Sequence, residues 1–164
     1  MDTRWKPSVT VAAIIERDGR YLLVEEETPE GLKLNNPAGH LDPGESPVDG
    51  CTREALEETT HRFAPTHLLG IYLSRLQRQR PGESPEDITY LRFAFAGTLG
   101  ETVPGAQLDT GIVRTVWMTP DEIRASVARH RSPLVLRCME DHLRGQRYPL
   151  ELVYTDASVQ QLQC

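Results

Sequence analysis

Three acidic residues of one short segment have a spacing that could bind a metal ion. Glu54, Glu57 and Glu58 fall at positions i, i+3 and i+4, which lie close together on one surface of a helix. Such a helix would aim three carboxylates into an arc of about 100°. They would repel one another unless a cation sits among them or one is protonated. Because hard oxygen ligands suit Mg²⁺, and also Mn²⁺, the segment predicts a divalent-metal site.

The alternative interpretation of these glutamates is a solvated acidic face, which charge runs on helices often form. The residues around them argue against it. Gly39 is followed after five residues by Glu45, and Glu45 after seven residues by Arg53. Arg53 and Glu57 could form a simple i, i+4 salt bridge worth about 0.3–0.5 kcal/mol. The same contact could hold the glutamate in the orientation that a metal needs.

The acidic segment has the signals of a helix over residues 47–59. Ser46 is suited to the N-cap, Pro47 to the first helical position, and Asp49 completes a variant of the capping box. The apolar residues of the segment are Val48, Cys51 and Ala55. We expect their stripe to face the core beside the acidic arc.

The remaining elements predict a mixed sheet with helices on its faces. Segments rich in β-branched and aromatic residues indicate strands or extended pieces at residues 8–16, 20–26, 33–41, 67–76, 88–99 and 112–118, with a polar loop at 80–87. Asp18-Gly19 predicts a tight hairpin between the first two strands. A second capping box, Thr119 to Glu122, opens a helix to about residue 130, and Ser132-Pro133 starts a third helix. Gly145 is placed to end that helix.

Length and composition indicate one domain, residues 1–164. The net charge of −6 argues against a nonspecific nucleic-acid binder, which normally has a basic face. Cys51, Cys138 and Cys164 lack metal-site spacing and disulfide density, so they are expected to be reduced thiols. Residues 1–7 lack the apolar region of a signal peptide, and no stretch approaches a membrane span. We therefore expect a cytoplasmic protein without membrane or nucleic-acid partners, as a monomer or a homodimer.

The pattern at residues 39–61 resembles the Nudix box, G-x5-E-x7-R-E-U-x-E-E-x-G-U, where U is a bulky apolar residue. The resemblance implies the α/β Nudix fold, an α/β/α sandwich with a mixed β-sheet and a loop-helix-loop box. It also implies a divalent metal, Mg²⁺ or Mn²⁺. The expected activity is hydrolysis of a nucleoside diphosphate linked to another group, through attack of water on phosphorus.

Carried over position by position, the resemblance gives expected roles to the residues of the box. The metal ligands would be Glu54, Glu57 and Glu58, with the Gly39 carbonyl as a further oxygen and Glu45 as a support or a ligand through water. Arg53 would orient a neighbouring glutamate, so Arg53, Glu54 and Glu57 form the expected catalytic set. Glu54 is the first choice as general base. The loop acids Glu83, Glu86, Asp87, Glu101 and Asp109 are unranked alternatives.

Two residues of the box depart from the family pattern. Thr60 stands where the family has glycine, and His61 where it has an apolar residue. Because glycine eases the left-handed turn that ends a helix, Thr60 implies either a different exit from the helix or local strain. His40, directly after Gly39, could reach a phosphate, although a lone histidine near an element boundary is more often structural or solvated.

A narrower resemblance extends over most of residues 5–152. The stretches 6–11, 36–41, 131–135 and 145–151 are similar to a branch of bacterial Nudix phosphatases. That branch implies release of orthophosphate from nucleoside di- and triphosphates. It also implies action on hydroxymethylpyrimidine pyrophosphate, with thiamine pyrophosphate as a further candidate.

The expected substrate contacts follow from side-chain chemistry. Arg92 and Arg131 could bind phosphate with their guanidinium groups, and Asn35 and Asn36 could read the edge of a ring. His40 joins this set because of its position next to Gly39. The aromatic residues that could stack on a ring are Tyr90, Phe93 and Tyr148. The alternative is that the aromatic residues fill the core and the arginines are surface cations.

Three function classes remain compatible with the sequence. A metal-dependent hydrolase is favoured by the complete acidic set. A Nudix-fold isomerase would need an additional cysteine and glutamate in its pocket, and Cys51 on the core side of the box helix is a poor candidate. A noncatalytic nucleotide-binding module would be indicated by lost box glutamates, and none is lost.

Overall fold

The computed structural model describes residues 4–160. The thiol of Cys164 and the first three residues of the stretch inspected for a signal peptide lie outside this range. Cys51 and Cys138 are both free, as predicted, and both are buried. Within residues 4–160, no helix is both long enough and apolar enough to cross a membrane.

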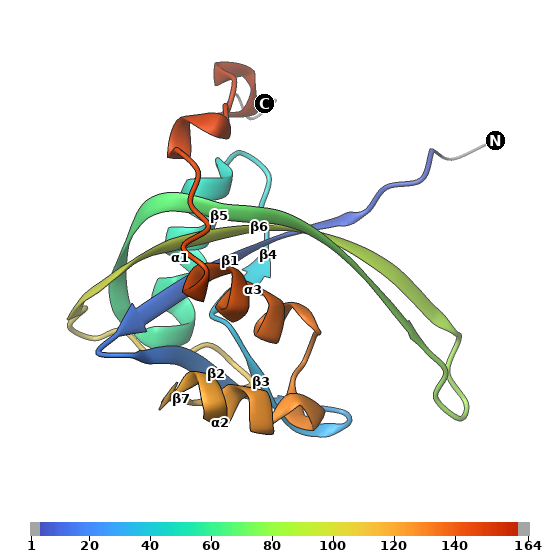
Figure 1. Cartoon of the computed structure of the whole chain (residues 1–164). Coiled ribbons are helices and arrows are strands. Elements are labelled where there is room, and N and C mark those ends of the chain that lie inside the picture. Colours follow the sequence, from blue (N-terminus) through green and yellow to red (C-terminus); the bar gives the residue numbers. More distant parts are fainter. Residues whose placement is uncertain (1–3, 161–164) are drawn as a thin grey trace.

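Seven strands of the described chain form one mixed sheet (Figure 1). They are β1 (Ser8–Arg17), β2 (Arg20–Thr28), β3 (Gly31–Asn35), β4 (Ala38–His40), β5 (His61–Arg78), β6 (Glu86–Thr102) and β7 (Ile112–Met118). The main order is β3-β2-β1-β6-β5, while β4 also pairs with β1 and β7 with β2. The β1–β6 pair is parallel and the other pairs are antiparallel, which confirms the predicted mixed sheet.

The β1–β2 hairpin forms at the predicted Asp18-Gly19 turn, where both residues have positive φ angles of 52° and 75°. Among the described residues, β1 and β2 are in register only at Glu16–Tyr21 and Arg17–Arg20. Beyond these pairs β2 leaves β1 and joins β3 and β7, while β4 takes a place on β1. The two parts of the sheet therefore diverge from the hairpin.

One face of the sheet is covered by α1 (Pro47–Thr59), which has the predicted bounds. The Ser46 hydroxyl accepts a hydrogen bond from the Asp49 amide at 3.1 Å, and Pro47 occupies the first turn. The reciprocal bond, which the Ser46 amide would donate to the Asp49 carboxylate, is not formed, because aspartate is one methylene shorter than glutamate. The predicted capping box is therefore half complete. Cys51 and Ala55 are fully buried against apolar side chains of β1 and β5.

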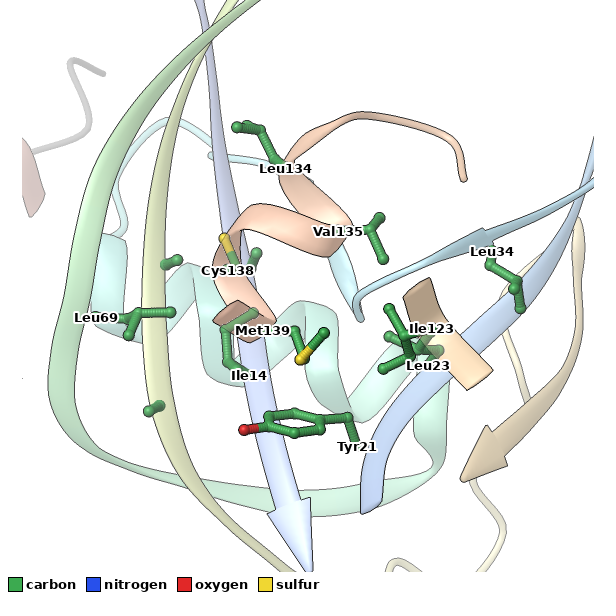
Figure 2. Packing of buried hydrophobic residues seen from close by; sticks show 13 residues of the cluster. Ile14, Tyr21, Leu23, Leu34, Leu69, Ile123, Leu134, Val135, Cys138 and Met139 are labelled. Atoms are coloured by element: carbon green, nitrogen blue, oxygen red, sulfur yellow. The ribbon is translucent and has the colours of Figure 1, made fainter. Parts of the chain in front are cut away.

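The opposite face is covered by α3 (Leu134–Leu143), as Figures 1 and 2 show. Its buried side chains Leu134, Val135, Cys138 and Met139 pack in one cluster with Ile14, Leu23 and Leu69. Alternate residues of β1 enter different clusters: Ala12 and Ile14 face α3, whereas Val11, Ala13 and Ile15 face α1. Two apolar clusters separated by the sheet form the expected α/β/α sandwich.

Two predicted elements are divided in the structure. The extended piece at 33–41 splits at Asn36-Pro37 into β3 and β4, which pair with different strands. The helix predicted to reach residue 130 is α2 (Pro120–Ala125) followed by the 3-10 turn η1 (Val127–Arg129). Its capping box is complete, but the Ser126 amide already bonds to the Ile123 carbonyl, and His130 joins Leu34 in an isolated β-bridge. Tertiary pairing thus overrides the local helix signal.

The strands β5 and β6 are longer than predicted. Strand β5 begins at His61, directly after the cap of α1, and β6 begins at Glu86, inside the predicted loop. The polar residues of that loop are accommodated by pairing across the strands, as between Arg75 and Asp87 at 2.7 Å and between Arg78 and Glu86. Two short 3-10 turns, η2 (Leu150–Leu152) and η3 (Ala157–Gln160), follow α3.

The end of α1 resolves the question raised by Thr60. This residue adopts the left-handed conformation, with φ 62° and ψ 11°, and its amide bonds to the Leu56 carbonyl at 2.8 Å. Thr60 therefore ends the helix with the same left-handed turn that glycine would form. For a residue with a Cβ atom, this conformation costs about 1–2 kcal/mol.

We expect Thr60→Gly to raise the free energy of unfolding by about 0.5–1 kcal/mol, because relief of strain exceeds the added entropy of the unfolded chain. Urea unfolding at equilibrium measures this change. The neighbouring helical variant Thr59→Gly should instead lower stability by more than about 1 kcal/mol, because it also removes a buried hydroxyl that donates to the Ala55 carbonyl at 2.6 Å. An unchanged or lower urea midpoint for Thr60→Gly would contradict the strain.

Candidate functional site

Arg53 lies at the centre of the acidic site. Its Nε and Nη2 donate to the two oxygens of Glu45 at 3.0 and 2.8 Å. Its Nη1 donates to Glu54 at 2.8 Å and to Glu57 at 3.2 Å. Nη2 also donates to the His40 carbonyl at 3.0 Å. One guanidinium group thus joins the helix, the loop before it and strand β4.

Glu45 links the loop after β4 to α1. Both of its carboxylate oxygens accept hydrogen bonds from Arg53, and one also accepts from the Asp42 amide at 2.7 Å. The Arg53 bonds hold the pKa of Glu45 below its usual range, so this carboxylate stays charged. With both oxygens engaged, Glu45 fits a positioning role better than a direct ligand role.

Glu54 is packed against the backbone of Gly39. A Cβ atom at position 39 would lie 2.1 Å from the Glu54 carboxyl carbon, a distance that no side chain tolerates. Gly39 therefore leaves room for the Glu54 carboxylate against the backbone of β4. Burial raises the pKa of Glu54, against the opposing effect of Arg53.

Glu58 is the most enclosed acid of the site. One of its oxygens accepts a hydrogen bond from the Ala38 amide at 2.9 Å, which fastens the start of β4 to α1. Burial raises the pKa of Glu58 to about 8, and the nearby charges of Glu26, Glu54 and Asp109 add to the effect.

The acidic side chains do not form a ready coordination shell: within residues 4–160, no three histidine, cysteine or acidic side chains converge as metal ligands. Glu57, whose side chain is 43% exposed, is turned toward Arg53. The donor set nevertheless fits a hard divalent cation, because it consists of carboxylates on one surface of α1. A cation would also relieve the unfavourable burial of Glu54 and Glu58 that their raised pKa values reveal.

A pocket of about 230 Å³ adjoins the acidic site where the two parts of the sheet diverge. Its walls come from strands β1 to β6 and from the segment that leads into α3. The expected substrate residues Asn35, His40, Arg92 and Arg131 all line it, together with Gly39 and Tyr90. Asn36 is buried beside it and accepts a hydrogen bond from Arg92 at 3.1 Å. The structure thus brings the five expected contact residues together.

Other candidates lie elsewhere. Phe93 packs against the apolar cluster on the α1 side of the sheet. Tyr148 pairs with Leu68 through both backbone bonds, and its side chain is exposed. Both ring nitrogens of His61 are engaged, by the Thr59 carbonyl at 2.6 Å and the Thr102 hydroxyl at 3.0 Å.

Glu26 is a pocket residue that the sequence interpretation missed. Its carboxylate pairs with Arg131 at 3.1 Å and lies 3.5 Å from the Asn35 amide nitrogen. A register shift between Glu25 and Glu26 in the β2–β7 pair marks a β-bulge, a feature that re-aims side chains next to active sites. The run of three glutamates at 25–27, at the end of an apolar strand, was the available signal.

The five loop acids that were unranked in the sequence differ in their contacts with the box. The Asp109 amide donates to the Glu57 carbonyl at 2.9 Å, and the charge of Asp109 raises the pKa of both Glu54 and Glu58. Three others pair with arginines of the β5–β6 hairpin: Glu83 with Arg80, Glu86 with Arg78, and Asp87 with Arg75. Glu101 is exposed near the end of β6. Asp109 is thus the loop acid beside the box.

Comparison with known proteins relates the chain to a family. A NUDIX domain family model matches residues 4–138. The chain is 35% identical over 149 residues to the protein named Phosphatase NudJ in Escherichia coli strain K12, covering 91% of this chain and 92% of that one. The same figures hold for the protein of that name in Shigella flexneri.

Two solved structures are also similar to this chain. A NUDIX hydrolase from Nitrosomonas europaea superposes with a TM-score of 0.79 at 52% identity, over 92% of this chain and 98% of that one. The solution structure of the E. coli ORF135 protein has a TM-score of 0.62 at 22% identity, over 85% and 90% of the two chains. The second likeness concerns the fold alone.

The raised pKa of Glu58 predicts how stability depends on pH in a chelator. The unfolded carboxyl has a pKa near 4.3, so between that value and about 8 the folded protein binds a proton that the unfolded chain releases. Stability should therefore fall as pH rises through this window. Melting temperatures from pH 5 to 9 should decline less in Glu58→Gln than in the wild type. The exposed variant Glu83→Gln is the control, and an equally steep decline in Glu58→Gln would contradict the assignment.

Proposed function

The chain belongs to the Nudix hydrolase family, and on that premise we propose that it hydrolyses phosphoanhydride bonds in nucleoside tri- and diphosphates or in small organic pyrophosphates, with Mg²⁺ as cofactor. The observation that carries this proposal is that two surfaces of opposite charge meet at Gly39 and His40. Carboxylates of α1 lie on one side, and a pocket lined by three arginines lies on the other. A phosphorylated molecule can lie across that boundary. Its phosphate would face the acids through the cation, and its remainder would enter the pocket.

Glu54, Glu57 and Glu58 would hold the cation, and Mn²⁺ could replace Mg²⁺. The Gly39 carbonyl is a further oxygen at the same point. When bound, such a cation supplies charge neutralisation for the phosphates and lowers the pKa of water. Burial is the main cause of the raised pKa values of Glu54 and Glu58, and repulsion between the free carboxylates adds to it.

Arg53 and Glu45 would position the ligands. Arg53 contacts Glu54 and Glu57 directly and is itself fixed by two bonds to Glu45. A side chain held in this way loses little entropy when the substrate binds. Loss of Arg53 would free Glu54 and Glu57 to turn away from the phosphate.

Glu54 is the proposed general base. It would accept a proton from the attacking water, whose oxygen forms the new bond to phosphorus as the bond to the leaving oxygen breaks. Asp109 is the second candidate, because it is the loop acid adjacent to Glu57 and Glu58. For the hydrolysis products, the name Phosphatase of the relatives at 35% identity favours orthophosphate.

The substrate would be contacted by the pocket residues that the sequence indicates. Arg92 and Arg131 would bind anionic groups, and Asn35, Asn36 and His40 would provide polar contacts. Tyr90 lines the same pocket, so its ring could stack on a planar group. The His40 ring, tilted by 52° at a centroid distance of 6.3 Å, lies beside it. Nucleotides, hydroxymethylpyrimidine pyrophosphate and thiamine pyrophosphate are the proposed substrates. For the isomerase alternative, the burial of Cys51 in the core gives no support.

Incubation with Mg²⁺ and a panel of nucleotides plus pyrimidine and thiamine pyrophosphates tests the activity, with separate detection of orthophosphate and pyrophosphate. We expect release of orthophosphate that stops in a chelator. Glu57→Gln should lower turnover at least about 10²-fold, whereas Glu83→Gln should not. Absence of metal-dependent release from every compound would refute the hydrolase proposal, and an active Glu57→Gln enzyme would refute the metal site.

Substitution of the two acids distinguishes the candidates for the base. We expect Glu54→Gln to lower kcat at least about 10²-fold and Asp109→Asn less than about tenfold. Glu83→Gln, which changes an acid that pairs with Arg80 in the β5–β6 hairpin, serves as the control. A fall of 10²-fold or more in Asp109→Asn would assign the base to Asp109.

A further inference from the structure

Two hairpins that belong to different parts of the sheet are joined at their ends. They are the β2–β3 hairpin, which turns at residues 28–31, and the β5–β6 hairpin (Figure 1). Oε1 of Glu30 accepts a hydrogen bond from Nη1 of Arg78 at 3.2 Å. The same oxygen accepts from Nε and Nη2 of Arg80 at 3.2 and 3.0 Å. One carboxylate oxygen of the first hairpin therefore holds two arginines of the second.

These ion pairs lie beyond the outer end of the pocket. On β5, Ser74 and Leu76 line the pocket, and Arg78 is the next residue on the same face, because side chains alternate between the faces of a strand. On β2, Glu26 lines the pocket, and Glu30 lies four residues farther along the hairpin, or about 13 Å in an extended chain. The two walls of the pocket thus continue outward until they meet at Glu30.

The partners are held in place, but they bind one another weakly. The Thr28 hydroxyl accepts a hydrogen bond from the Glu30 amide at 3.2 Å and donates to a carbonyl of the same turn at 2.7 Å. Arg78 also pairs with Glu86 of β6. The side chains of Glu30, Arg78 and Arg80 all reach solvent, and such ion pairs add little net stability. The contact can therefore close the outer end of the pocket and still open readily.

The pocket that is bounded in this way is small. Its volume of about 230 Å³ lies below the range of about 300–1,000 Å³ that is usual for sites of drug-sized ligands. One ring fits this space when its phosphates face the carboxylates of α1. A second ring attached to the first would extend outward, past Glu30.

We propose that Glu30, Arg78 and Arg80 form a latch across the outer end of the pocket, and that this latch favours organic pyrophosphates whose organic part is a single ring. This inference rests on the proposed function and names the substrate class for the same site. The latch touches neither the phosphates nor the reacting water. A longer substrate binds only when the ion pairs have opened, so the latch lowers its kcat/KM relative to that of a one-ring substrate.

Glu30→Gln tests the latch with hydroxymethylpyrimidine pyrophosphate, which has one ring, and thiamine pyrophosphate, which has two. The ratio of kcat/KM for the two-ring over the one-ring compound should rise at least about threefold, with an unchanged melting temperature. Loss of the Glu30 charge alone would lower this ratio, because the thiazolium ring is cationic. Glu27→Gln is the matched control, since Glu27 is exposed on the same hairpin. An unchanged or lower ratio in Glu30→Gln would overturn the proposal.

Arg80→Gln and the double variant test whether the two sides act as one contact. Arg80→Gln should also raise the ratio. The double variant should match Glu30→Gln, because removal of Glu30 already breaks every bond of the latch. Fully additive effects would show that the two residues act separately, and the latch would be refuted.

Binding separates this proposal from the proposed function. If neither pyrophosphate is hydrolysed, calorimetry in Mg²⁺ supplies the corresponding ratio of binding constants for the wild type and for Glu30→Gln. A ratio that rises in the variant would then support the latch while the hydrolase function fails. An unchanged ratio, or no binding of either compound, would overturn the latch.

Discussion

The close approach of α1 to strand β4 is the constraint on which the site depends. The Glu54 carboxylate lies where a side chain at Gly39 would lie, and Glu58 holds the Ala38 amide at 2.9 Å. These contacts set the distance between the helix and β4. The packing of the buried Cys51 and Ala55 in the core sets which face of the helix is turned toward the sheet. Arg53 then joins Glu45, Glu54 and Glu57 into one network, so the mutually repelling acids are held in place by a cation and by backbone contacts.

The second requirement is the divergence of β1 and β2 beyond their hairpin. It opens the space into which β4, Asn35 and the segment before α3 bring their side chains. An acidic helix and a pocket with cationic side chains thereby share one boundary in a chain of net charge −6. The buried guanidinium group of Arg92 and the raised pKa of Glu58 lie on opposite sides of that boundary. Each is unfavourable alone, and a cation with a phosphorylated ligand would relieve both.

The sequence predicted an element well where the element depends on contacts between residues that are close in the sequence. The capped helix from Pro47 and the Asp18-Gly19 hairpin depend on neighbours in sequence, and both form as predicted. The predicted bounds were wrong where contacts with residues distant in the sequence determine the structure. The helix after Thr119 stops early because His130 pairs with Leu34, and the polar residues from Glu86 onward join a strand because arginines lie opposite. The position of Glu26 required the β-bulge, which depends on pairing with β7.

The sequence by itself determined the family, the acidic set on α1 and the residue types suited to bind phosphate, because the box spacing is a local property of one helix and its flanks. It also located the anomaly at Thr60. Only the tertiary structure decided that Asn35, His40, Arg92 and Arg131 share one pocket, since they come from segments joined only through the sheet and its crossing connections. It also decided that Asp109 is the acid beside the box, and that Glu30 meets Arg78 and Arg80 of the β5–β6 hairpin. Burial and pairing are long-range properties, and no spacing of residues along the chain specifies them.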